Sequence, residues 1–114
     1  MESILTSIKK LLGISEEYTE FDPEIIMCIN TAITNLTEIG VGPSEGFFIE
    51  DETTTWTEFI PEPTLQKIEA VKSYIHLNVK LLFDPPISSA HIDSINKQIE
   101  KIEWRLHFIM ESNS

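Results

Sequence analysis

The stretch VKLLFDPPISSAHI, residues 79–92, decides the fold because it joins two helix-length apolar patterns. Proline lacks a backbone amide and keeps the preceding residue out of the helical region, so the upstream helix should end near Phe83, before Pro85. Ser88 or Ser89 then offers a hydroxyl that can cap the amides of a following helix. The joint therefore predicts two helices connected by a short turn.

Apolar residues recur at helical spacing on both sides of this joint. Upstream they form a wide stripe, which predicts a buried helix over about 63–83. Downstream, alternating steps of three and four leave one narrow seam on a helix over about 89–110. The seam could pack within the subunit or along another chain, and both arrangements stay open at this point. It consists of Ile92, Ile95, Ile99, Ile102, Leu106 and Ile109.

Two shorter patterns predict helices in the N-terminal half. Residues 3–12 form an amphipathic pattern that ends at a glycine. Asp22-Pro23 is a strong helix start, because the carboxylate can cap free amides and proline suits the first helical position. Apolar periodicity continues from there over 22–39. The sequence thus predicts a mainly α protein, a single small bundle of about four helices in one domain over residues 1–114.

Helical periodicity lapses over residues 40–62. The segment contains β-branched and aromatic residues typical of short strands, so we expect an irregular loop that could contain one β-hairpin. Its large apolar side chains are costly to leave in water. Either they cover the helices as a satellite of the core, or they form an interface with another subunit or protein. They are Phe47, Phe48, Ile49, Trp56 and Phe59.

The charge distribution is uneven. The formal net charge is −11, and residues 11–66 contain no Lys or Arg. Tight binding to a phosphate backbone depends on clustered cations, so this part of the chain should repel nucleic acid. It is either a solvated face that keeps the domain in solution or a surface beside which DNA moves without binding.

Motifs that carry chemistry are missing from the sequence. The three histidines are isolated, Cys28 is the single cysteine, and no glycine-rich phosphate loop or nucleophile elbow occurs. We therefore expect no enzyme, no cofactor and no metal site. A lone cysteine without an export leader indicates the cytoplasm, and no apolar run approaches the roughly 20 residues of a membrane helix. Trp104 and Phe108, four apart, could form an aromatic ridge but are more often core at such spacing.

With these patterns in place, the chain resembles the small head-tail connector proteins of tailed bacteriophages and prophage remnants, also called head-completion or adaptor proteins. The resemblance covers nearly the whole chain and rests on several similar segments that occur in the same order, with no single decisive motif. It is carried by ILTSIKKLLGI at 4–14, IGVGP at 39–43, Trp56 before Phe59-Ile60, EAVKSYIHLNVKLLFDPP at 69–86, Ser88-Ser89, and QIEKIEWRL at 98–106.

The resemblance implies a structural virion protein in the head-tail neck, present in the host cytoplasm during assembly. Such a subunit belongs to a homo-oligomeric ring, commonly a dodecamer, that binds the portal protein above and a tail-side or stopper protein below. Genomic DNA passes through the ring without specific binding, and no membrane is involved. On this basis Glu50, Asp51 and Glu52 would flank the channel, and the Phe47–Phe59 loop would supply the subunit or portal interface.

One alternative belongs to a different class of function. A cytoplasmic protein-binding or inhibitor domain could use an acidic face to mimic nucleic acid and occupy a basic host protein. Association with portal-bearing heads would favour the connector, whereas association with a host DNA-binding protein would favour the mimic.

Overall fold

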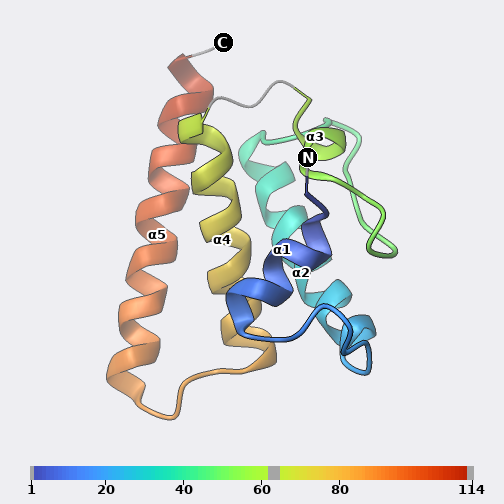
Figure 1. Cartoon of the computed structure of the whole chain (residues 1–114). Coiled ribbons are helices and arrows are strands. Elements are labelled where there is room, and N and C mark those ends of the chain that lie inside the picture. The colour runs from blue at the N-terminus through green and yellow to red at the C-terminus, as the bar shows by residue number, and fades with distance from the viewer. Residues whose placement is uncertain (1, 62–64, 113–114) are drawn as a thin grey trace.

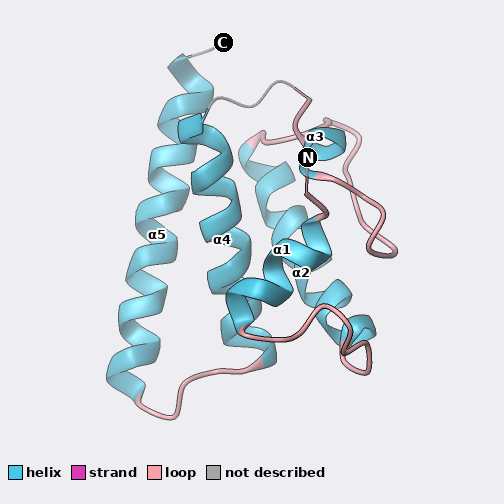
Figure 2. Ribbon diagram, viewed as in Figure 1, coloured by secondary structure: helices cyan, strands magenta, loops and turns pink. Residues whose placement is uncertain are grey.

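The computed structural model describes residues 2–61 and 65–112. Its described part is a bundle of helices without a named strand, which confirms the predicted mainly α fold (Figures 1 and 2). The helices are α1 (Ile4–Leu12), α2 (Asp22–Ile39), α3 (Trp56–Phe59), α4 (Leu65–Phe83) and α5 (Ser89–Ser112).

Helix α4 lies at the centre of the bundle and packs against α1, α2 and α5 (Figure 1). Its wide apolar stripe explains this position, because a helix with three neighbours must bury much of its circumference. Val71, Ile75 and Val79 are fully buried, whereas Leu82, at the end of the stripe, is largely exposed beside the proline joint. The predicted helix start at residue 63 lies outside the described residues.

Helix α5 packs mainly on α4 and only slightly on α2. The narrow seam therefore lies inside the subunit, with Ile95, Ile99 and Leu106 buried, which settles the alternative that the sequence left open. The Ser88 hydroxyl accepts a hydrogen bond from the amide of His91 at 3.3 Å and so caps the helix as predicted. Because the seam is narrow, the opposite face of α5 remains in solvent.

The start of α2 differs from the prediction in one respect. Asp22 is the first helical residue and Phe21 is the cap position, without a side-chain cap. The carboxylate of Asp22 pairs instead with the ammonium of Lys9, whose Nζ lies 2.9 Å from Oδ1. The ion pair joins the end of α1 to the beginning of α2.

No β-hairpin forms in the described part of the 40–62 segment. The segment is tied down by partners elsewhere in the chain, which removes the need for strand pairing within it. The amide of Ile4 donates to Thr54 O at 3.0 Å, and the amide of Trp56 donates to Glu2 O at 3.3 Å. Ser3 and Thr55 consequently form an isolated antiparallel bridge.

Candidate interaction surfaces

The first candidate surface is the loop before α3. Its backbone at Ile49 is held by Asn30 of α2, whose Nδ2 donates to Ile49 O at 3.0 Å and whose Oδ1 accepts from Ile49 N at 2.7 Å. Successive side chains here alternate between buried and exposed positions. Phe47 packs on Phe59 with ring centroids 4.9 Å apart, Ile49 is buried, and Phe48 between them is 65% exposed. The two hydrogen bonds between Asn30 and the Ile49 backbone therefore hold the loop with Phe48 in solvent.

Ile49, Trp56 and Phe59, three of the five residues predicted for an interface, belong to the core of the subunit. The indole Nε1 of Trp56 donates to the Ser7 hydroxyl at 2.9 Å, and the ammonium of Lys72 lies 5.5 Å from the centroid of its ring. These side chains could reach a partner only if the loop opened. Phe47 is half-buried, so the interface hypothesis for this loop rests on Phe48.

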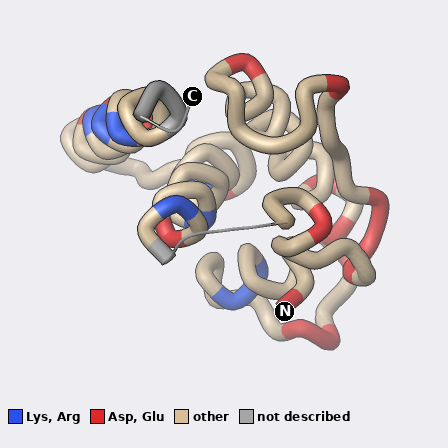
Figure 3. The backbone as a smooth tube through the Cα atoms, turned by 90° about the horizontal axis from the view of Figure 1, so that it is seen from above, with Lys and Arg blue, Asp and Glu red and all other residues tan. Residues whose placement is uncertain are grey.

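The acidic run Glu50, Asp51 and Glu52 follows directly and is exposed. Asp51 Oδ1 accepts hydrogen bonds from the Thr53 hydroxyl at 2.5 Å and the Thr53 amide at 2.9 Å, which lower the pKa of Asp51. Seen from above, acidic positions gather on the loops away from α5, whereas basic positions lie on α1, α4 and α5 (Figure 3). The loops thus carry acidic residues without cations, whereas α5 carries both signs, with Asp93, Glu100 and Glu103 beside its three cations.

The second surface is the outer face of α5. Trp104 is 73% exposed and Phe108 is 58% exposed, and their rings stack in parallel with centroids 6.1 Å apart. Lys97, Lys101 and Arg105 follow one another at single helical turns beside them and are exposed. The expectation that the two aromatic residues are core is wrong. Their exposure could have been predicted from their positions along the helix, because both residues fall on the face opposite the isoleucine seam.

The third surface is a hollow where α1, the following loop and the end of α4 meet, and sequence patterns did not reveal it. It measures about 660 Å³, and Leu12, Ile14, Tyr18, Phe21 and Phe83 contribute its apolar lining. The Phe21 ring lies 5.5 Å from both Tyr18 and Phe83, measured between centroids. A row of partly exposed aromatic rings thus lines the opening.

The loop beside this hollow is fixed by Lys9, which is only 2% exposed. Besides pairing with Asp22, its Nζ donates to Glu16 O at 3.1 Å and to Tyr18 O at 2.7 Å. A buried ammonium is tolerated when a carboxylate and further acceptors surround it. The lysine therefore holds the loop in one conformation.

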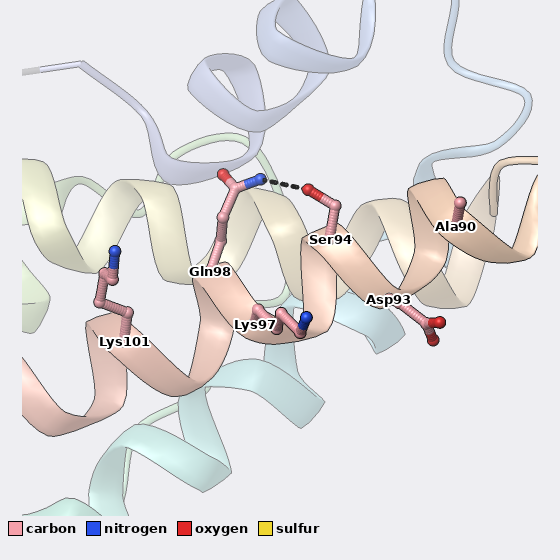
Figure 4. A pocket seen from close by; sticks show the side chains of 6 residues that line it. All are labelled: Ala90, Asp93, Ser94, Lys97, Gln98 and Lys101. Atoms are coloured by element: carbon pink, nitrogen blue, oxygen red, sulfur yellow. Dashed lines mark hydrogen bonds between the residues drawn. The ribbon is translucent and has the colours of Figure 1, made fainter.

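Enclosed sites for chemistry are not evident in the described residues. A hollow of about 460 Å³ is lined by residues of α5 alone, and Figure 4 shows their side chains along that single helix, with Gln98 donating to Ser94 at 3.5 Å. Residues 2–61 and 65–112 contain no group of three or more His, Cys, Asp or Glu that could hold a metal ion. Burial, with Glu24 nearby, raises the pKa of the half-buried Cys28.

Comparison with known proteins identifies the family. A family model described as phage connector protein matches residues 4–113. The chain belongs to this family. No curated protein and no solved structure matches the connector. Membership gives the connector a structural role in the phage particle, consistent with the surfaces described above. None of its described helices is long and apolar enough to cross a membrane.

Proposed function

We propose that the connector forms a ring between the portal vertex and the tail, completes the head and conducts genomic DNA. The observation that carries this proposal is the family match over residues 4–113, which spans nearly the whole chain. Family membership supplies the structural role, and the distribution of surfaces supports the ring.

A cyclic ring needs two different contact surfaces on each subunit, because neighbours meet head to tail. The connector offers exposed aromatic side chains in separate places: Phe48 on the loop before α3, and Trp104 with Phe108 on α5. Figures 1 and 3 place that loop and α5 at opposite sides of the molecule. Such separated surfaces let one subunit contact more than one partner at the same time, and twelve copies are the number we propose.

The acidic run gives the ring a surface that does not retain DNA. Carboxylates beside the channel repel phosphates, whereas clustered Lys or Arg would hold the duplex through counterion release. We place Glu50, Asp51 and Glu52 along the channel and Phe48 at a subunit or portal interface. The hydrogen bonds of Thr53 favour the ionised form of Asp51 at this position.

The test uses particles assembled with and without the connector. Electron microscopy should show DNA-filled heads without tails when the connector is missing, and purified connector added to these heads should restore tail attachment. Heads that acquire tails normally without it would contradict the proposal. Binding of the purified protein to a host DNA-binding protein, and not to portal-bearing heads, would favour the nucleic-acid mimic.

The channel assignment has its own test in assembled particles. The triple variant Glu50→Lys, Asp51→Lys and Glu52→Lys should attach tails but eject DNA more slowly, because cations would bind the passing phosphates. The matched control replaces the same residues by Gln, Asn and Gln, which removes charge without adding cations. Normal ejection by the lysine variant would place these carboxylates away from the channel.

A further inference from the structure

Two surfaces of the connector are chemically complementary to each other. The α5 ridge, which we define as Lys101, Trp104, Arg105 and Phe108, combines exposed rings with cations. The end hollow, defined above by its apolar lining, is bordered by the loop that carries Glu16, Glu17 and Glu20. One surface is an aromatic projection with Lys101 and Arg105 on one side and Glu100 on the other. The other is an aromatic depression bordered by carboxylates.

The ridge is unusual for a surface left in water. Its two rings stack on each other on the face opposite the seam by which α5 packs on α4. Within the described residues, Lys101 and Arg105 form no ion pair with a carboxylate, whereas Lys9, Lys10 and Lys80 do. Exposed aromatic residues beside Arg are the composition of a binding hot spot.

The end hollow is already organised to receive a ligand. Lys9 binds the carbonyls of Glu16 and Tyr18 and fixes the backbone of the loop. The Ser15 hydroxyl donates to Glu17 at 2.5 Å, and the Tyr18 hydroxyl donates to Glu20 at 3.0 Å, which fixes two carboxylates of the border. A surface that is ordered before binding loses less conformational entropy on association.

We infer that the α5 ridge of one connector seats in the end hollow of the next copy. The inference rests on the proposed ring, and it specifies which surfaces of neighbouring subunits meet. Trp104 and Phe108 would enter the aromatic hollow, while Lys101 and Arg105 would approach the glutamates of the loop. These contacts offset the repulsion between two chains that each carry a net charge of −11.

The positions of the two surfaces fit a head-to-tail contact. The hollow lies at the end of the bundle where α4 stops, whereas the ridge lies on the C-terminal half of α5, toward the other end of the molecule (Figure 1). One copy can therefore use its ridge and its hollow at the same time. A contact of this kind is heterologous, and it closes into a ring when the rotation between copies permits.

Crosslinking on assembled particles tests the contact without substitutions. Portal-bearing heads that lack the connector are incubated with an equal mixture of ¹⁴N- and ¹⁵N-labelled connector and treated with a carbodiimide, which joins lysine to carboxylate. We expect peptides that link Lys101 to Glu16, Glu17 or Glu20 and combine both isotopes. Connector-bearing heads without such mixed peptides would overturn the inference and leave the proposed function standing. Links from Lys101 to portal carboxylates in their place would also overturn it, and heads that bind no connector would overturn both proposals.

Charge exchange provides the second test. The ridge variant Lys101→Glu/Arg105→Glu and the border variant Glu17→Lys/Glu20→Lys should each reduce the copies bound per head by about tenfold or more, because like charges would face each other. An equal mixture should restore binding, since each reversed surface then finds its complement on the other variant. The matched control Glu38→Lys/Glu45→Lys, at exposed positions elsewhere, should bind as the wild type does.

The outcome is interpretable because all of these side chains are exposed. Substitutions at such positions change the free energy of unfolding little, and urea denaturation verifies this for each variant. Normal binding by either reversed variant alone would overturn the inference. Failure of the mixture to restore binding, with both variants folded, would do the same.

Discussion

Replacing Trp56 and Phe48 separately by Ser distinguishes the core role of the loop before α3 from its surface role. Trp56 is fully buried, and removing a buried tryptophan side chain costs about 3–5 kcal/mol. The Ser7 hydroxyl also loses the indole donor at 2.9 Å, which adds about 1 kcal/mol. The sum of about 4–6 kcal/mol is a large share of the roughly 5–15 kcal/mol that stabilises a domain.

Phe48 is the matched control because it belongs to the same loop but is 65% exposed. About a third of its surface is buried, so Phe48→Ser should cost only about 0.5–1 kcal/mol. Urea denaturation followed by circular dichroism gives both free energies of unfolding, and binding to portal-bearing heads gives the surface role. We expect Trp56→Ser to unfold readily and Phe48→Ser to stay folded but bind heads more weakly. Equal free energies of unfolding for the two variants would refute the assignment of Trp56 to the core.

Three further predictions concern Gly42 and Asn30, which position the loop before α3, and the half-buried His76. Gly42 has φ +84, and a Cβ there would collide with the Phe59 ring, so Gly42→Ala should cost at least about 1 kcal/mol and lower the thermal midpoint; an unchanged midpoint would contradict this. Asn30→Ala removes both hydrogen bonds to the Ile49 backbone and should cost about 1–3 kcal/mol, with faster amide exchange at Ile49 as the direct measurement. Burial lowers the pKa of His76 below its usual 6.5, so the unfolded chain binds the proton more readily and stability falls as pH drops below about 6.5. His76→Gln should flatten the urea midpoint between about pH 7 and 5.5, and an equally steep profile in the variant would exclude His76 as the cause.

Periodic patterns made the long helices predictable. Each turn of α4 and α5 repeats an apolar residue, so the signal accumulates over many positions and the proline joint fixes where one helix stops. The short helix α3 carries no such repetition. It follows a capping interaction in which the Thr55 amide donates to Glu58 Oε2 at 3.2 Å, and that interaction involves only one turn.

The contacts that order the loop before α3 were not predictable, because their partners lie far apart in the chain. Asn30 and Ile49 are 19 residues apart, and Ser7 and Trp56 are 49 residues apart. The β-branched and aromatic content therefore indicated a loop that could contain a hairpin, although the backbone found its partners on α2 and near the N-terminus. The expected irregular loop is present in the described residues, whereas the hairpin is not.

Lys9 shows a different limit of sequence interpretation. A lysine in the last turn of a helix is expected in solvent, where it interacts with the helix dipole. The structure buries it because Asp22 and two loop carbonyls surround the ammonium, and no local pattern encodes that meeting. The same lysine fixes the loop that borders the end hollow. The burial of Lys9 and the presence of the hollow were both unpredictable from the sequence, because both depend on contacts between separate segments of the chain.

The narrow seam of α5 indicates that the isolated subunit leaves a contact surface on this helix uncovered. A helix that covers one neighbour needs a seam on one side, and its remaining face is normally polar. On α5 that face carries Trp104 and Phe108, and exposed apolar surface of this kind is typical of a contact site. Their placement away from the seam is explained by the contact outside the monomer that we propose. Replacing both by Gln should leave the free energy of unfolding nearly unchanged and weaken assembly on heads, whereas a large loss of stability would return the pair to the core of the subunit.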